Sequence, residues 1–325
     1  MRFAMPRTVP PGLWRRVPPA IFPPILGALA LILAWRGAAA LFALDTALIE
    51  AGAGAMLALT LFAVLAYAVK LGWRPAVLHD ELTILPGRSG VGAGVLALYL
   101  LAGILAPYAP TAARMMLVLG MLAHVIVLAV LLAVYRDGPA ERRQITPAWH
   151  INWAGFFVAA RVAPLLGWPR LAEVLFWPSL AAAAVIWAVS ARQFLFATPP
   201  APLRPLLAIH VAPFALTATV GAGLGYQGLA IAFAMAGLAL LLVLAASARW
   251  LLAAGFSPFW GALTFPLAAM AGAWIALAQD GVPGARIVAG LLLVAATLVN
   301  LPILFLVLRD WARGRLATRT NAAIA

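Results

Sequence analysis

Few side chains in this sequence could perform covalent chemistry, and they do not form a recognisable group. The chain has four histidines and no cysteine, which excludes disulfides, thiolate metal sites and cysteine nucleophiles. No glycine-rich phosphate loop, histidine–glutamate metal motif or serine–histidine–aspartate arrangement is readable. We therefore expect no catalytic residues, no bound metal and no cofactor. A membrane enzyme acting on lipid would need convergent polar residues, and the sequence offers only scattered ones: Asn152, Arg161, His124 and His210.

The charged residues favour passage of an anion or a neutral solute. None of the nine acidic residues lies well inside an apolar run, whereas a cation channel normally carries acidic rings and a proton-coupled transporter usually needs a buried carboxylate. His124 or His210 could relay protons, although a structural, hydrogen-bonded role is favoured for each. Arg161 lies about ten residues into an apolar run, where an ionised side chain needs water or a partner. It predicts an electropositive vestibule that attracts anions or, alternatively, snorkelling to the interface or an ion pair with Glu173 or Glu50.

The composition places the chain in a membrane. Of its 325 residues, 66% are hydrophobic and only 10% are charged, whereas a soluble domain is about 45–50% apolar and about 25% charged. So few charges cannot cover a water-soluble particle, which excludes soluble enzymes, disordered proteins and nucleic-acid-binding domains. The sequence predicts an all-α membrane protein with almost no domain outside the bilayer.

Apolar runs separated by charges, prolines or glycines predict ten transmembrane helices. Their approximate ranges are 17–35, 47–69, 91–107, 113–135, 151–167, 172–196, 204–222, 227–247, 257–278 and 285–308. Ten spans put both termini on one side, and 17 of the 22 Lys and Arg residues then share that side. This bias makes both termini cytoplasmic. We expect a cytoplasmic segment over 1–16, a transmembrane domain over 17–308 and a basic cytoplasmic tail over 309–325 that meets anionic lipid.

The prolines recur at about the spacing of one helical hairpin, which resembles an internal repeat. Five prolines recur at this spacing, each in or just before an odd-numbered span: Pro24, Pro86, Pro147, Pro205 and Pro258. Four more lie farther along odd-numbered spans: Pro107, Pro164, Pro213 and Pro266. Proline kinks a helix, and inside a bilayer the freed carbonyls must be satisfied by protein or water. We therefore predict five hairpins whose odd helices are kinked and form an inner ring. Gly27 and Gly155 lie on these spans, and glycine there permits close approach of another helix or of a solute.

Three stretches resemble one known family. Phe256-Ser257-Pro258, followed by the run from Trp260 to Leu267, resembles the ninth-span signature of the tellurite-resistance/C4-dicarboxylate transporter family, which includes the slow-type anion channels. Pro18-Pro19-Ala20-Ile21-Phe22 resembles the first span of that family, and Leu203-Arg204-Pro205 through Pro213 resembles its seventh. The fifth span departs from the family pattern, because His150-Ile151-Asn152-Trp153-Ala154-Gly155 keeps only the glycine.

The resemblance implies a homotrimer in the bacterial inner membrane. Each protomer would be a ring of five hairpins around a central pore for small anions such as chloride and nitrate. The motif assigns Phe265 as the gate that plugs this pore, with Pro266 bending the helix at the same level. Pro24, Gly27, Gly155 and Pro213 are then candidate pore-lining or kink residues, and Arg161 is a candidate for attracting anions. The alternative is a secondary transporter of C4-dicarboxylates or other organic anions, and the family name also covers tellurite resistance.

Overall fold

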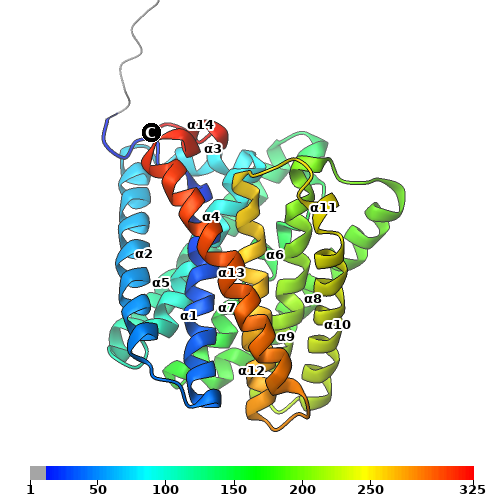
Figure 1. Ribbon diagram of the computed structural model, residues 1–325. Coiled ribbons are helices and arrows are strands. Elements are labelled where there is room, and N and C mark those ends of the chain that lie inside the picture. The colour runs from blue at the N-terminus through cyan, green and yellow to red at the C-terminus, as the bar shows by residue number, and fades with distance from the viewer. Residues whose placement is uncertain (1–11) are drawn as a thin grey trace, which may run out of the picture.

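The computed structural model describes residues 12–325, and its regular elements over this range are helices (Figure 1). Nine of them are long and apolar enough to cross a membrane. These stretches are Pro19–Phe42, Ala47–Trp73, Leu85–Leu105, Pro110–Asp137, Pro169–Phe196, Ala201–Gly223, Gln227–Ala246, Pro258–Gln279 and Ala285–Ala312. The prediction of an all-α membrane protein is therefore confirmed for the described part of the chain.

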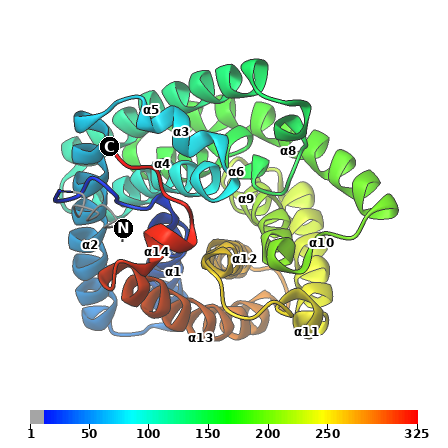
Figure 2. The ribbon, with the colours of Figure 1, turned by 90° about the horizontal axis from the view of Figure 1, so that it is seen from above.

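Five long helices lie on the outside of the molecule when it is seen along its axis (Figure 2). They are α2 (Ala47–Trp73), α5 (Pro110–Asp137), α8 (Pro169–Phe196), α10 (Gln227–Ala246) and α13 (Ala285–Ala312). Only 17–33% of the residues in the most apolar stretch of each are buried. Their exposed faces carry large apolar side chains such as Leu65, Ile126 and Leu298. Because exposing so much apolar surface to water is unfavourable, these faces are suited to contact lipid tails.

The remaining long elements lie inside this layer. They are α1 (Phe22–Phe42), α4 (Leu85–Leu105), α9 (Val211–Gly223) and α12 (Thr264–Gln279), and in these spans 56–78% of the residues in the apolar stretch are buried. Small residues permit the close packing. A Cβ atom added to Gly90 of α4, for example, would lie 2.5 Å from the backbone carbonyl of Pro19. The inner helices therefore pack backbone against backbone, as is typical of small residues in membrane helices.

Three of the inner helices begin as 3₁₀-helices and continue as α-helices. The 3₁₀ segments are η1 (Pro19–Ile21) before α1, η4 (Ala201–His210) before α9, and η5 (Pro258–Leu263) before α12. Pro24, Pro213 and Pro266 are each the third residue of the α-helix that follows. A proline is tolerated in the first turn because its missing N–H has no helical partner there. The prolines thus mark a change of helix type rather than a kink in the middle of an α-helix.

The span predicted over 151–167 is not one continuous helix. It consists of α6 (Trp149–Trp153), α7 (Phe156–Val162) and the 3₁₀ segment η3 (Ala163–Leu166), with an interruption at Ala154-Gly155. A side chain explains how the interruption is stabilised, because His124 Nε2 donates to the Asn152 carbonyl at 2.7 Å. The imidazole N–H of His124 thus takes the place of the backbone N–H that would bond to the Asn152 carbonyl in a continuous helix.

Two other expectations change with the structure. α1 continues past Arg36 to Phe42, because Arg36 pairs with Glu50 of α2 and donates to the Ile104 carbonyl. The basic tail is folded rather than extended: α14 (Arg315–Arg319) packs against the rest of the protein, and Asp310 accepts hydrogen bonds from Arg315 and Arg319. Of the predicted N-terminal segment, residues 1–11 lie outside the described range.

The end of the molecule that carries the C terminus, here called the terminal end, is held by a buried ion pair (Figure 1). Lys70 of α2 pairs with Glu81 of α3 (Val77–Thr83) and also donates to the Val17 carbonyl at 2.8 Å. Glu81 accepts a further hydrogen bond from the Ala323 backbone N–H at 3.1 Å. Burial raises the pKa of the Glu81 carboxyl above its ordinary range, although Lys70 opposes the rise. One ion pair therefore joins both ends of the described chain to α2.

Candidate functional site

Three cavities follow one another along the inner elements. The terminal cavity has a volume of about 240 Å³ and is lined by Pro86, Ser257, Phe259, Arg319 and others. The neck has a volume of about 40 Å³ and shares Pro23, Ile151, Ile209 and Ala262 with the terminal cavity. The distal cavity, at the other end of the same helices, has a volume of about 520 Å³. The interior is therefore hollow at both ends and narrow between them.

All five inner elements line both the neck and the distal cavity. At the neck the lining residues include Leu26 (α1), Leu96 (α4), Val158 (α7), Leu216 (α9) and Phe265 (α12). Farther along the same helices, the distal cavity is lined by Ala34, Gly103, Arg161, Thr219 and Gly272. Since the same five elements surround both spaces, the two cavities lie on one axis between these helices.

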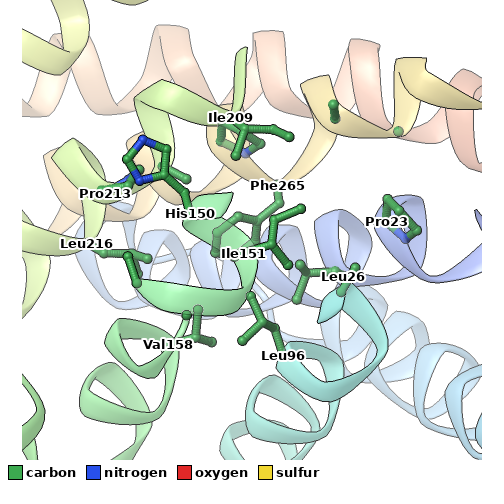
Figure 3. A pocket seen from close by; sticks show the side chains of 17 residues that line it. Pro23, Leu26, Leu96, His150, Ile151, Val158, Ile209, Pro213, Leu216 and Phe265 are labelled. Carbon is green, nitrogen blue, oxygen red and sulfur yellow. The ribbon is translucent and has the colours of Figure 1, made fainter. Parts of the chain in front are cut away.

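Phe265 is the largest aromatic side chain at the neck (Figure 3). It is the second residue of α12, directly after the 3₁₀ segment η5, and only 7% of its surface is exposed. The remaining neck volume has room for a few water molecules on the scale of about 10–15 Å³ each. The surrounding side chains are almost all apolar, including Ile151, Ile209 and Leu216. An apolar constriction of this kind can exclude water and ions by dewetting.

The helix breaks around the neck leave carbonyl groups free, and side chains satisfy them. His124 donates to the Asn152 carbonyl, Trp187 Nε1 donates to the His210 carbonyl at 3.1 Å, and Thr264 Oγ1 donates to the Gly261 carbonyl at 2.7 Å. These three carbonyls mark the ends of α6, η4 and η5. Because each is already bonded, a solute at the neck meets mainly hydrocarbon rather than a ring of free carbonyl acceptors.

The structure places the predicted proline and glycine residues in two groups. Pro213, Pro266 and Gly155 line the neck. Gly27 instead faces α12 and α13, where an added Cβ atom would overlap Thr264 and approach Asn300 Oδ1 to 2.6 Å. Pro24 packs on η5, with its Cδ atom 3.0 Å from the position of a Cβ on Gly261, while its neighbour Pro23 lines the neck.

The distal cavity contains two arginines with different partners. Arg36 is bound to Glu50 through two hydrogen bonds of 2.8 and 2.6 Å, and Tyr108 donates to the same carboxylate. Glu50 therefore neutralises Arg36. Arg161 forms no ion pair within residues 12–325, and its Nη1 atom is buried without a hydrogen-bond partner. The guanidinium group of Arg161 lies beside Gly272 of α12. The free charge in this cavity belongs to Arg161.

One polar feature at the neck was not predicted from the sequence. His150, at the start of α6, lines the neck beside Phe265 (Figure 3). It contacts His210, the last residue of η4. The two histidines are 60 residues apart. No local spacing motif connects residues so distant, and the sequence offered only His210 and His124 as isolated candidates.

Comparison with known proteins assigns a family. The family model described as SLAC1, voltage-dependent anion channel, matches residues 16–308. This range includes the five inner elements and every residue that lines the neck and the distal cavity, whereas the terminal cavity is also lined by Arg319 and Thr320, beyond the match. It confirms the resemblance found in the first, seventh and ninth spans. No curated protein gives a match.

Proposed function

The chain belongs to the SLAC1 family of voltage-dependent anion channels, and from that premise we propose that it conducts small monovalent anions through a central pore. Members of this family are channels or transporters rather than enzymes. The pore in this proposal is the series of terminal cavity, neck and distal cavity. The observation that carries it is the position of Phe265, in a neck of about 40 Å³ between spaces of about 240 and 520 Å³.

Phe265 closes the pore in this mechanism. Its benzyl side chain fills the axis where five helices come together, and the neighbouring side chains are apolar. An anion that enters the neck loses its water shell without gaining a strong ligand, so the barrier is high while the ring is in place. A change of rotamer would move the ring aside, and no covalent step is needed.

Charge selects the sign of the ion. Arg161 contributes positive charge to the distal cavity, no carboxylate is among the described residues that line this cavity, and Glu50, beside it, is paired with Arg36 and Tyr108. Anions therefore accumulate at this mouth and cations do not. The neck offers few ligands, and weak binding suits conduction because a tightly held ion does not leave.

Replacing Phe265 by alanine tests the proposal. In purified protein reconstituted into liposomes, Phe265→Ala should raise chloride or nitrate flux by on the order of tenfold or more, since each reduction of about 1.4 kcal/mol in a barrier is tenfold in rate. Phe259→Ala is the matched control, because Phe259 lines the wide terminal cavity and not the neck. Equal flux in the wild type and in folded Phe265→Ala protein would remove the gate.

The setting of the channel is also part of the proposal. The charge bias of the loops supports an orientation with both termini in the cytoplasm of a bacterial inner membrane. The family resemblance supports a homotrimer, in which some of the apolar surface of the outer helices meets neighbouring protomers. Tellurite and C4-dicarboxylates are tested in the same liposomes as competing anions, and saturable, pH-gradient-dependent flux of a dicarboxylate would favour the transporter alternative.

A further inference from the structure

Two buried imidazole rings face each other at the side of the neck. His150 Nε2 lies 2.9 Å from His210 Nδ1, the ring centroids are 5.1 Å apart, and the ring planes are nearly perpendicular at 85°. His150 itself lines the neck, together with Ile151 and Phe265 (Figure 3). The other lining residues have no titratable side chain. Of the residues described, His150 is thus the one titratable group in contact with the narrowest part of the cavity series.

The pair leaves a fully buried ring nitrogen without a hydrogen bond, in contrast to His124, another buried histidine. His124 donates from Nε2 to the Asn152 carbonyl, and its Nδ1 therefore accepts from the Tyr99 hydroxyl at 3.0 Å. Both of its nitrogens are satisfied. His150 Nδ1, however, is buried and has no hydrogen-bond partner. A buried polar atom without a partner is uncommon in a folded protein, and His150 Nδ1 is therefore available to a water molecule or a ligand.

Counting protons shows what this atom does in each charge state. The neutral pair has two ring protons, one of which lies in the hydrogen bond between the rings. The outer nitrogens of the pair are His150 Nδ1 and His210 Nε2, and the second proton is on one of them. His150 Nδ1 is therefore a donor in one arrangement and an acceptor without a proton in the other. When the pair takes up one proton, both outer nitrogens carry N–H groups whichever ring owns the shared proton. The singly protonated pair therefore always presents a donor at His150 Nδ1, together with one positive charge.

No fixed acid is available to neutralise that charge. Among the elements packed against the pair, α9, η5 and α12 carry no titratable side chain other than those of the pair itself. The only carboxylates on the others are Asp137, which is paired with Arg136 at the end of α5, and Glu173 in the first turns of α8. The remaining titratable or charged groups on those elements are Arg88 and Tyr99 (α4), Arg114, His124 and Tyr135 (α5), Arg170 and Arg192 (α8), Arg204 (η4) and Arg249 of the short helix α11 (Ala248–Leu251).

We propose that the His150–His210 pair is a proton-dependent anion-binding site in the wall of the neck. Uptake of one proton from water gives the pair a positive charge and a buried N–H donor at His150 Nδ1. A small monovalent anion such as chloride or nitrate accepts that hydrogen bond and supplies the missing counter-charge. At higher pH the pair is neutral and the neck is apolar. This inference rests on the proposed channel function and adds to it a ligand and a condition for conduction.

Flux as a function of pH tests the site. We place the channel in the Phe265→Ala background, so that the gate does not mask the effect, and measure nitrate flux from pH 8 to pH 5 with equal pH on both sides. Flux should rise by up to about tenfold per pH unit while the pair is mostly neutral, because the protonated fraction changes by that factor. His150→Gln removes the N–H donor from the neck and should give a flat profile, whereas His210→Gln leaves His150 without the ring that shares its proton and should give a shallower one.

His79→Gln is the matched control, since His79 is half exposed beside Asp80 and remote from the neck. It should retain the pH dependence. A profile that stays pH-dependent in His150→Gln, that keeps its full steepness in His210→Gln, or that is lost in His79→Gln, overturns the inference. If Phe265→Ala conducts equally at all pH values, the histidine site fails while the channel stands. If it conducts no anion at any pH, the proposed function itself fails.

A binding measurement on the wild-type protein does not depend on any variant folding. The chain has only four histidines, so a spectrum of ¹⁵N-histidine-labelled protein in detergent contains few side-chain signals. At pH 5, replacing gluconate with chloride should shift the ring nitrogen signals of one coupled pair, and at pH 8 it should not. Absence of any chloride-dependent shift in a buried histidine at pH 5 contradicts the site.

A pH gradient that shifts the reversal potential would instead identify coupled proton–anion transport.

Discussion

The neck and the distal cavity are built from the same five elements but have opposite character. The neck has a volume of about 40 Å³, is lined by aliphatic side chains and is filled by Phe265. The distal cavity has a volume of about 520 Å³ and contains Arg36 and Arg161. The neck lies where the inner helices break or change type, whereas the distal cavity lies along their regular α-helical portions. Narrowing and charge are thus separated along the axis, so that each can be altered without the other.

The separation has a consequence for conduction. A permanent charge inside the neck would hold an anion tightly in a dry, low-dielectric space, whereas the same charge in a wide cavity is partly screened by water. The charge proposed for the His150–His210 pair is not permanent, because it is present only while the pair holds an extra proton. In the proposed mechanism, Arg161 in the distal cavity concentrates anions without trapping them, and the barrier is set by the volume of Phe265. The predictions below alter the neck, the distal cavity or a third region that serves as a reference.

The largest effect on stability is expected away from both regions, at the buried Lys70–Glu81 pair. Lys70→Met leaves the Glu81 carboxylate without its ionic partner, and breaking a buried pair on one side is destabilising by about 3–5 kcal/mol. Thermal unfolding in detergent measures the loss. Conductance of the surviving folded protein should be unchanged, because neither residue lines a cavity. A variant as stable as the wild type would show that the pair contributes little.

The thermal stability of Lys70→Met should also depend on pH. Burial raises the pKa of Glu81 above its ordinary value of 4.5, and the lost attraction of Lys70 no longer opposes the rise. The folded state then binds the proton more tightly than the unfolded state. Stability is therefore lost as the pH rises from 4.5 through the raised pKa. We expect Lys70→Met to unfold at a lower temperature at pH 8 than at pH 5, and the reverse order would contradict this assignment.

A matched pair of substitutions contrasts the packing beside the neck with that of the distal cavity. A methyl group on Gly27 would overlap Thr264, which itself bonds to the Gly261 and Pro23 carbonyls, so Gly27→Ala should destabilise by about 1–3 kcal/mol. A methyl group on Gly272 would meet only the flexible end of Arg161, at 2.9 Å. Gly272→Ala should change stability by no more than about 0.5 kcal/mol. Equal losses of stability in Gly27→Ala and Gly272→Ala would mean that the helices are packed equally tightly beside the neck and at the distal cavity.

Removing the charge of the distal cavity should have the smallest functional effect. Arg161→Gln in the Phe265→Ala background should lower anion current about two- to tenfold at low salt, since a charge in a wet cavity is worth on the order of 1 kcal/mol. The difference should disappear near 1 M salt, where the screening length is about 3 Å. Arg170→Gln, at an exposed position on α8, is the control. A salt-independent loss would point to a structural role for Arg161.

Composition and proline placement were enough to predict that the chain lies in a membrane, nine of the ten proposed spans (all but the fifth) and the family. These features follow from apolar run length, which the bilayer fixes, and from ninth-span residues such as Trp260 and Pro266. The position of Phe265 at a constriction agrees with the motif. Helix ends were less predictable: Arg36 and Arg88 were assigned to loops, but both lie inside helices because they find partners on other elements.

Long-range partners could not be predicted from the sequence. The Lys70–Glu81 pair, the His150–His210 pair and the bond from His124 to the Asn152 carbonyl depend on which helix faces stand opposite each other. The interruption of the fifth span also escaped prediction. Its sequence is largely apolar apart from Asn152 and Arg161, and the break depends on a side chain from α5 that supplies the missing donor. Gly27 was predicted either to line the pore or to permit close approach of another helix, and only the structure shows that helix rotation turns it toward α12 and α13.

The central claim is that the volume of one side chain at position 265 closes the path between the two larger cavities. The direct measurement is nitrate flux, at constant pH and salt, through proteins with Phe, Leu, Val and Ala at this position, beside the same series at Phe259. The account predicts flux that rises at each step as the side chain at 265 becomes smaller, with no trend at 259. Flux independent of side-chain size at 265 in folded protein, or an equal trend in both series, would contradict it.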